Sequence, residues 1–225
     1  MDRGKQKAAH IFFVFALILL NACGAQQTSQ ATPQLVKVYV TSAASSRLTD
    51  LYNCSTPSMA ILLSGPQTAD ITIRLGQPDS LSLPAYQIGT DDVAVVVQSQ
   101  NNIDTLTVDQ VHSIFLGQVT NWKDVGGSVM PIQVWIYAQG EDLRQIFEQN
   151  VMNNQPVTSL ARLAVSAQNM SDSVANNAGS IGFLPRSLET ANVHDVYKVA
   201  SEPLLAITKS QPQGVVNDLI ACLQK

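Results

Sequence analysis

The chain has 225 residues, of which 13% are charged and 45% hydrophobic, a composition that indicates a globular protein with an uncharged polar surface. This length accommodates one ordinary domain or two small lobes. The net charge of −4 and the pI near 5.2 argue against nucleic acid as a partner, because phosphate backbones are bound by basic surfaces.

The beginning of the chain has the pattern of an export signal. Arg3, Lys5 and Lys7 form a basic segment, and the apolar run IFFVFALILL follows at 11–20. Ten apolar residues are too few to span a bilayer as a mature helix, but they match the apolar region of a signal peptide. The segment is therefore read as a targeting signal and not as part of the fold.

The sequence LNAC at 20–23 resembles a bacterial lipobox, in which an obligatory cysteine follows a small residue. The resemblance implies cleavage before Cys23 and lipid on its thiol and new amine, which together suffice for stable anchoring. Residues 1–22 are then a lipoprotein signal peptide, and the polar residues 23–34 are a tether. An ordinary secretory signal with a chance cysteine is the alternative interpretation.

Strand patterns and helix patterns alternate along the remainder of the chain. The residues 93–97 are all apolar, which is typical of a strand buried on both faces of a sheet. Strands are predicted at 35–43, 69–76, 86–98, 131–138, 179–185 and 203–209. Helices are predicted at 45–54, 105–117, 141–151 and 214–224. The alternation predicts an α/β fold with a parallel or mixed sheet.

The helix predicted at 105–117 has clear signals at both ends. Thr107 and Gln110 have the spacing of a capping box, and Gly117 closes the helix. The residues expected to face the core are Val111, Ile114 and Phe115.

The segment TVDQVHSIFLGQVTNWKDVGG, at 107–127, resembles the signature of phosphate-type ABC transporter substrate-binding proteins. In that family a helix ending in I-F-x-G is followed by TNW and a turn with a glycine pair. The matching residues are Ile114, Phe115, Gly117, Thr120, Asn121, Trp122, Gly126 and Gly127. The neighbouring DDVAVVVQ, at 91–98, is similar to the first strand that crosses between the lobes of such proteins, and GSIGFLP, at 179–185, to the return crossing.

The resemblance implies a two-lobed clamshell of the type II periplasmic binding-protein kind, with two crossing strands. Lobe one is expected to contain residues 35–92 and 182–225, and lobe two residues 93–181. Because the first and last helices then share a lobe, the resemblance also implies a disulfide between Cys54 and Cys222 in the exported protein.

On lobe one, the resemblance places the ligand loop in TSAASSR, before the first helix. Hydroxyls bind oxyanions without adding titratable groups, and arginine adds a bidentate charge. The ligand-binding residues implied there are Thr41, Ser42, Ser45, Ser46 and Arg74. The alternative role for Ser45 or Ser46 is plain capping of that helix. The segment at 55–68, where the family has a Gly/Ser-rich ligand loop, looks shortened.

On lobe two the family's pattern changes. Family members have an arginine and a Gly-Ser-Gly-Thr-like turn where this chain has YAQGEDLR at 137–144. Gly140 is retained, but Glu141 and Asp142 replace the hydroxyl donors. Carboxylates there occupy the electropositive start of the helix and repel a phosphate. The phosphate site is therefore expected to be altered or lost, with a neutral or cationic ligand or none.

Tyr137, Gln139 and Gly140 are the lobe-two residues expected to line such a changed cleft. For Tyr137 the alternative is an ordinary half-buried residue of a strand, since its ring is amphipathic. Trp122 is expected to pack in its turn and not to stack on a ligand.

The function implied by the resemblance is that of an extracytoplasmic solute-binding lipoprotein on a bacterial membrane. Its partners are then a small solute, phosphate or another small polar molecule, and an ABC permease, and the protein is expected to be a monomer without a cofactor or metal. A membrane-anchored sensor or interaction lipoprotein with the same fold is the alternative. Catalysis is not expected, because His112, placed on the exposed side of its helix, and His194, placed in a loop, belong to no catalytic or metal motif.

Overall fold

The computed structural model describes residues 32–77, 82–153 and 155–225. The expected signal peptide, Cys23 and most of the tether lie outside these described residues. Among the helices within the described ranges, none is both long enough and apolar enough to cross a membrane.

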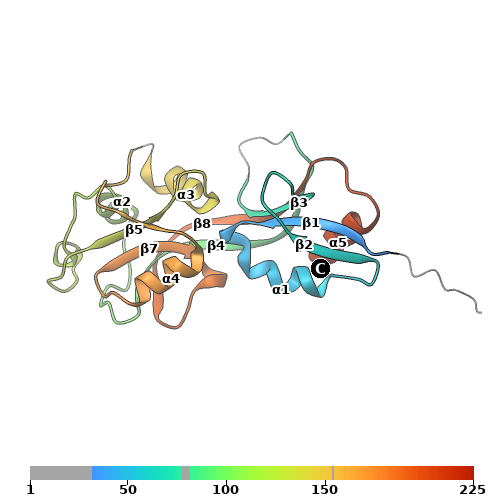
Figure 1. The fold of residues 1–225 in the computed structure, drawn as a ribbon. Helices are drawn as coiled ribbons and strands as arrows, with labels where there is room; N and C mark the ends of the chain where they lie inside the picture. The colour runs from blue at the N-terminus through green and yellow to red at the C-terminus, as the bar shows by residue number, and fades with distance from the viewer. Residues whose placement is uncertain (1–31, 78–81, 154) are drawn as a thin grey trace, which may run out of the picture. The chain divides into compact units, whose positions relative to one another are not determined.

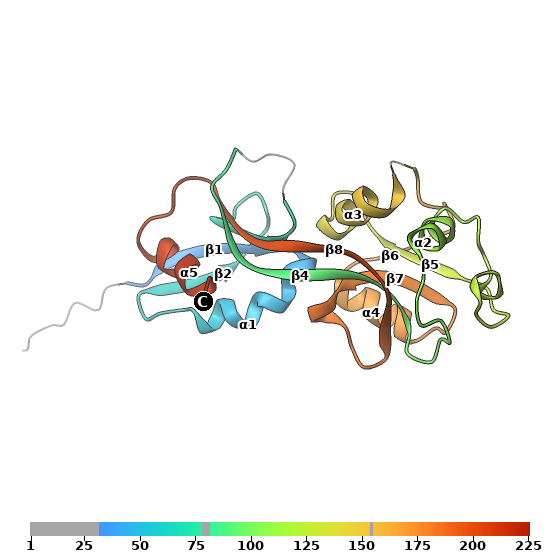
Figure 2. The ribbon, with the colours of Figure 1, turned by 180° about the vertical axis from the view of Figure 1, so that it is seen from behind.

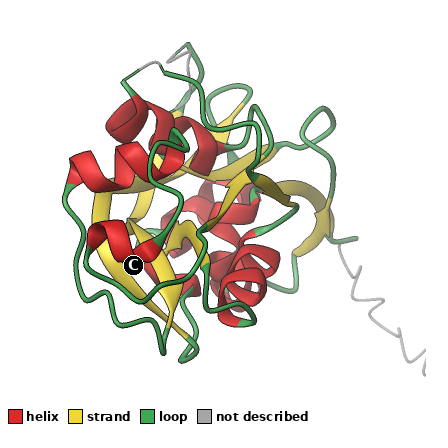
Figure 3. Ribbon diagram, turned by 90° about the vertical axis from the view of Figure 1, so that its left-hand side faces the viewer, coloured by secondary structure: helices red, strands yellow, loops and turns green. Residues whose placement is uncertain are grey.

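Eight strands of the described chain form one mixed sheet in the order β2-β1-β3-β8-β4-β7-β5-β6 (Figure 1). The strands are β1 (Gln34–Val40), β2 (Met59–Leu63), β3 (Ile71–Leu75), β4 (Ala85–Gln98), β5 (Gln133–Tyr137), β6 (Arg162–Ala164), β7 (Ser180–Pro185) and β8 (Val193–Thr208). The α-helices are α1 (Leu48–Asn53), α2 (Val108–Phe115), α3 (Asp142–Phe147), α4 (Ala167–Ala175) and α5 (Gly214–Leu223). Shorter helical turns are η1 (Ser42–Arg47), η2 (Trp122–Val125), η3 (Glu148–Met152) and η4 (Arg186–Leu188). Helices and loops surround the strands when the sheet is seen from one end (Figure 3).

Two long antiparallel strands, β4 and β8, connect two groups of elements. They pair from Ala85 opposite Ile207 to Gln98 opposite Val193. Toward one end β8 also pairs with β3, and toward the other end β4 also pairs with β7. Figure 2 shows both strands running side by side between the elements around β1 and those around β5. The fold is the predicted α/β clamshell with two crossing strands.

We call the elements around β1, β2 and β3, together with α1 and α5, lobe one. The elements around β5, β6 and β7, together with α2, α3 and α4, are lobe two. The sequence limits predicted for the lobes stay predictions, but the pairing of β8 with both β3 and β4 favours placing the second limit inside β8.

The return crossing is β8 and not the predicted segment 179–185. That segment forms β7, which pairs only with β4 and β5 among the described strands. All six residues of β7 are buried, and a Cβ on Gly182 would lie 2.4 Å from Met170 Sδ, so β7 is a central strand of lobe two. In the first half of β8 only Val193, Val196 and Val199 are buried, so the sequence shows no strand-like alternation and His194 was placed in a loop. His194 accordingly lies in this strand, with Nε2 2.8 Å from the Ile103 carbonyl oxygen.

The strand and helix that the sequence defined most clearly are confirmed. All five residues of the run 93–97 are fully buried within β4. In α2, the Thr107 hydroxyl accepts from the Gln110 N–H and the Gln110 side chain accepts from the Thr107 N–H, which completes the capping box. The predicted core residues Val111, Ile114 and Phe115 are fully buried.

Aromatic side chains form the core of lobe two. The rings of Phe147 and Phe183 stack with centroids 4.1 Å apart, and Phe115 lies 4.4 Å from Phe147. Trp122 is fully buried and donates its indole N–H to the Gly179 carbonyl over 3.2 Å, which confirms its packing role. His112 is half-buried and not exposed as predicted, because its helix packs against this core.

Two strands and one α-helix were not predicted. β2 lies in the segment expected to be a shortened ligand loop, and it is an edge strand whose Leu62 and Leu63 are about half exposed. β6 has three residues, too few to give an alternating pattern. α4 carries mostly polar and small residues, and Ser166 caps it by accepting from the Asn169 N–H.

Cys54 and Cys222 form a disulfide, with their Cα atoms 5.8 Å apart. Cys54 is the residue that ends α1, and Cys222 lies in the last turn of α5. Arg47, before α1, donates to the carbonyl oxygen of Leu223 over 3.1 Å and so supports the same contact between the two ends of the chain.

Candidate solute-binding cleft

The cleft between the lobes is bridged by the Asp142 carboxylate. Thr41, at the end of β1 in lobe one, donates its hydroxyl to Asp142 Oδ2 over 2.6 Å. The Leu75 N–H, at the end of β3, donates to the same oxygen over 3.1 Å. Asp142 belongs to lobe two and is only 4% exposed, so its charge is met by hydrogen bonds away from bulk water.

The turn between β5 and α3 carries this carboxylate into the cleft. Gly140 has φ = +90°, a left-handed conformation that favours glycine and redirects the chain after the strand. The Leu143 N–H donates to Asp142 Oδ1 over 3.0 Å. The carboxylate therefore accepts three hydrogen bonds, and at least one reaches each of its oxygens.

Two further hydrogen bonds join the lobes. The Ala167 N–H, at the start of α4, donates to the Ser42 hydroxyl oxygen over 2.6 Å. The Arg74 guanidinium donates to Gln145 Oε1 over 3.3 Å. Thr41, Ser42 and Arg74 thus each reach lobe two, and their part in binding a ligand stays a prediction.

Two cavities flank the Asp142 bridge. The first has a volume of about 460 Å³ and contains no charged side chain in its lining. Its polar residues include Tyr39, Thr41, Ser42, Ser45, Ser166 and Gln168. The second has a volume of about 360 Å³ and is lined by Arg74, Gln139, Gly140, Arg144, Gln145, Glu148 and Gln149. The predicted ligand residues are therefore divided between two spaces, one uncharged and one rich in arginine and glutamine.

Two of the predicted residues line neither cavity. Ser46 lies within η1 with Ser45, and neither caps α1, whose first turn follows Arg47 without a side-chain cap. The capping role is therefore wrong for both serines. Tyr137 is 1% exposed and packs edge-on against Phe183 with centroids 5.3 Å apart, so it is fully buried and not half-buried.

The Tyr137 hydroxyl is buried and has no hydrogen-bond partner among the described residues. Burial raises the pKa of Tyr137 well above its ordinary value, and the charges of Asp142 and Glu141 raise it further. The phenol therefore stays protonated. The phenol is thus a buried polar group without a hydrogen-bond partner among the described residues, and it lies near the carboxylates of Glu141 and Asp142.

Two neighbouring carboxylates, Glu141 and Asp142, act on the titratable groups in this part of the cleft. Burial raises the pKa of Glu141, and the neighbouring Asp142 charge adds to the effect. The pKa of Tyr39 is raised by burial and then by Glu141 and Asp142. No ion pair of Glu141 or Asp142 with a cation occurs in the described part of the chain. An anion in this position is therefore disfavoured.

Replacing Glu141 by Gln is expected to stabilise the protein at neutral pH. Because the folded-state pKa of Glu141 is raised, its ionised form costs stability, and this cost grows as pH rises through the ordinary and then the raised pKa. Partial exposure screens the charge, so the gain is below about 1 kcal/mol. Urea unfolding at neutral pH and below about pH 4 measures it. An equal gain at both pH values would contradict the electrostatic cause.

The arginines near the cleft are not equally available. Arg144 pairs with Glu148 over 2.6 Å and donates to the Tyr137 carbonyl oxygen over 3.2 Å, so it is part of the lobe-two core. Arg74 is half-buried and makes no ion pair among the described residues; it hydrogen-bonds Gln145 and the Leu75 carbonyl oxygen. Arg74 is therefore the guanidinium that could meet a ligand group in the second cavity.

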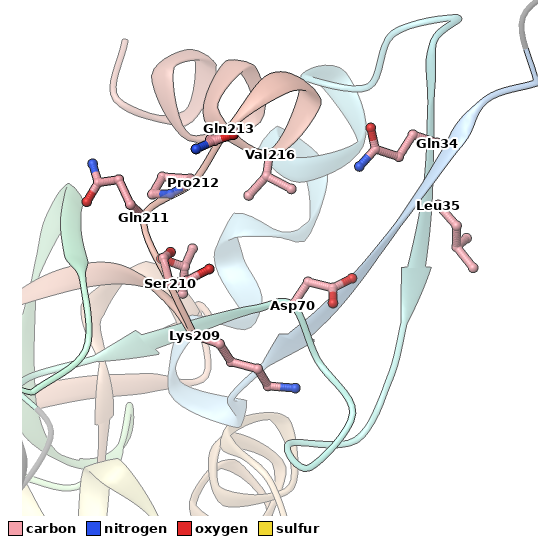
Figure 4. A pocket seen from close by; sticks show the side chains of 10 residues that line it. Gln34, Leu35, Asp70, Lys209, Ser210, Gln211, Pro212, Gln213 and Val216 are labelled. Carbon is pink, nitrogen blue, oxygen red and sulfur yellow. The ribbon is translucent and has the colours of Figure 1, made fainter.

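A larger cavity, of about 650 Å³, lies in lobe one alone (Figure 4). It is bordered by the start of β1 and the loop before α5, and Figure 4 shows Asp70 and Lys209 at its lower side. The Asp70 carboxylate accepts from the Lys37 N–H over 2.8 Å, and Lys209 donates to the Gln67 carbonyl oxygen. Because both groups serve lobe one and no lobe-two residue lines this space, it is a weaker candidate than the cleft.

The start of α4 and Tyr39 are parts of the cleft that the sequence did not indicate. Ser166 and Gln168 are far from Thr41 and Ser42 in the sequence, and the fold brings them to the same cavity. A signal for α4 was present, since Ser166 precedes apolar residues spaced three and four apart. No group of three or more metal-ligating side chains occurs in the part of the chain that the structure describes.

The paired crossing strands, the two lobes and the cleft between them define a type II periplasmic binding-protein fold. The chain belongs to the PBP superfamily, since the model of the PBP superfamily domain matches residues 77–219.

Solved structures with this fold are similar over most of the chain. A candidate phosphate ABC transporter substrate-binding protein from Clostridium perfringens, with bound phosphate, has a TM-score of 0.76 and 20% identity, covering 84% of this chain and 93% of its own. An ABC-type phosphate transport receptor from Vibrio cholerae has a TM-score of 0.64 and 22% identity, with coverages of 84% and 93%. A variant of the OxyR2 regulatory domain from Vibrio vulnificus has a TM-score of 0.61 and 14% identity, with coverages of 85% and 97%. At these identities the likeness shows the fold.

Proposed function

We propose that the protein is an extracytoplasmic solute-binding lipoprotein whose cleft takes a small neutral or cationic solute in place of free phosphate. The observation that carries this proposal is the Asp142 carboxylate, which accepts from Thr41 and Leu75 across the cleft. The family and the fold support solute binding, and the cleft chemistry argues against the phosphate of the similar proteins.

Phosphate would compete with the Asp142 carboxylate for the same hydrogen-bond donors. To use the Thr41 hydroxyl and the Leu75 N–H, it would have to displace the Asp142 oxygen that accepts from both. It would then meet the charges of Asp142 and Glu141, and two like charges about 4 Å apart repel by about 4 kcal/mol at the effective dielectric of a protein surface.

The first flanking cavity is suited to an uncharged polar molecule. Its walls combine the apolar Leu48 and Leu63 with the hydroxyls of Ser45 and Tyr39. Hydroxyls donate and accept hydrogen bonds, and apolar walls bury the remainder of a small ligand. The neighbouring carboxylates also favour a cationic group over an anionic one.

Calorimetric titration of the purified protein, in mild detergent, tests this proposal. Phosphate and sulfate are compared with small neutral polar solutes and small amines at one ionic strength. Phosphate is expected to give no binding heat up to about 1 mM, which limits its binding free energy to about −4 kcal/mol. Tight and selective phosphate binding would restore the ordinary family ligand. Absence of binding by every solute would favour the sensor or interaction lipoprotein.

We further propose that the protein is anchored through lipid on Cys23 and presents its closed form to an ABC permease as a monomer. In wild-type cells the protein is expected in the membrane fraction, because two or more acyl chains give stable anchoring. The variant Cys23→Ser is expected in the soluble fraction or uncleaved. Equal amounts of both proteins in the soluble fraction, without acyl mass on the wild type, would rule out the anchor.

A further inference from the structure

Two of the hydrogen bonds that cross the cleft end on a single carboxylate. Asp142 Oδ2 accepts two hydrogen bonds from lobe one, and Oδ1 accepts the Leu143 N–H of its own lobe. A carboxylate and a free oxyanion offer donors the same chemistry, namely negatively charged oxygens with several lone pairs. The chain therefore supplies, from one of its own side chains, the kind of group that such donors would otherwise take from solution.

The burial of Asp142 makes this contact strong. At 4% exposure, the carboxylate has exchanged water for three donors, and separating the lobes would remove two of the three. The hydrogen bonds involve an ionised acceptor, and such bonds are about twice as strong as neutral ones. Because the group is tethered, its local concentration does not depend on any solute.

Other contacts bring the same lobes together without involving Asp142. The Ala167 N–H of α4 donates to the Ser42 hydroxyl, and these residues are 125 positions apart in the sequence. Gly76, at the end of β3, lies so close to α3 that a Cβ there would be 3.1 Å from Ile146 Cδ1. The lobes are thus in direct contact at points other than the Asp142 bridge.

We propose that Asp142 is a tethered substitute for a bound oxyanion, which holds the two lobes closed in the absence of any solute. Solutes in the flanking cavities then bind to a protein that is already closed. Removal of the carboxylate uncovers a site for a small oxyanion such as formate or phosphate, made by the Thr41 hydroxyl and the Leu75 and Leu143 N–H groups. This inference uses the cleft of the proposed function but concerns its closure.

Amide hydrogen exchange, measured residue by residue by NMR on the purified protein, tests this inference. The key reporter is the Ala167 N–H, because Ser42 protects it across the cleft and Asp142 does not touch it. In the variant Asp142→Ala, exchange at Ala167 is expected to be at least about tenfold faster, since local opening sets the exchange rate. The Asn169 N–H, which is held by Ser166 within lobe two, serves as the internal reference and stays unchanged.

Millimolar formate or phosphate supplies the second part of the test. In Asp142→Ala either anion is expected to restore the slow exchange at Ala167, whereas neither changes it in the wild type. The matched control is Asp104→Ala, which removes the same charge from an exposed position. Exchange at Ala167 is expected to be as slow in this control as in the wild type. Slow exchange at Ala167 in Asp142→Ala without added anion would overturn the inference, as would fast exchange that no oxyanion slows.

A milder variant keeps the inference testable if Asp142→Ala does not fold. Thr41→Val removes the 2.6 Å hydrogen bond but retains the carboxylate, and Thr105→Val is its exposed control. Faster exchange at Ala167 is expected in Thr41→Val alone. Equal rates in both variants would contradict the proposal that Asp142 holds the lobes closed. These measurements need no solute, so a negative result does not bear on the proposed solute binding. A solute screen without binding, in turn, does not bear on the closure of the lobes by Asp142.

Discussion

Phosphate affinity is expected to rise at least tenfold, or by about 1.4 kcal/mol, when Glu141 is replaced by Ser and Asp142 by Thr. The double variant removes two negative charges from the cleft and frees the Thr41 hydroxyl and the Leu75 N–H from their present acceptor. It also adds two hydroxyl donors. Gly140 is left unchanged, because its φ of +90° would strain any other residue.

The two positions contribute differently, and the single variants separate them. Glu141→Ser removes a half-buried charge but leaves Asp142 in the cleft, so little gain is expected. Asp142→Thr frees the donors and is expected to supply most of the effect. Calorimetric titration with phosphate at one ionic strength measures all three variants. Tight phosphate binding by the wild type, or an equal affinity in wild type and double variant, would contradict the role assigned to Asp142.

The parts of the fold that were predicted depend on local signals. The run 93–97 could be assigned because a strand buried on both faces is apolar throughout. The capping box of Thr107 and Gln110 could likewise be assigned, because both residues lie within one turn of the chain. The return crossing was assigned to the wrong segment, because β8 has β4 as its only described strand neighbour over its first half, which leaves that half partly exposed and polar.

The cleft was predicted on one side better than on the other. Thr41 and Ser42 were assigned to the cleft by the resemblance of TSAASSR to a ligand loop, and in the structure they directly follow β1. Their partners were not predicted, since Ala167 lies 125 positions from Ser42 and the helix that carries it was not assigned. For Asp142 the sequence indicated the unusual charge, and only the fold shows which donors it accepts.

Removing the disulfide is expected to cause the largest loss of stability. The variant Cys54→Ser with Cys222→Ser should lower the free energy of unfolding by about 5 kcal/mol, because a cross-link between residues separated by 168 positions restricts the unfolded chain strongly in the chain-entropy model. Urea unfolding without reductant measures the difference. Labelling of thiols after denaturation should find none from Cys54 or Cys222 in the exported wild-type protein, and two reactive thiols would end the idea.

The effect of this disulfide should extend beyond the two cysteines, because α5 is the last element of lobe one. Its Leu219, Ile220 and Leu223 are buried. Its end is also held by Arg47, which donates to the Leu223 carbonyl oxygen, and by Gln224, which donates to the Gln87 carbonyl oxygen. Without the disulfide, amide exchange in α5 is expected to become faster than in β4, since a terminal helix can separate locally before the sheet unfolds. Reduced wild-type protein is the control for the substitutions: it should match the double variant, and a variant much less stable than the reduced protein would point to lost packing at the serines and not to the lost cross-link.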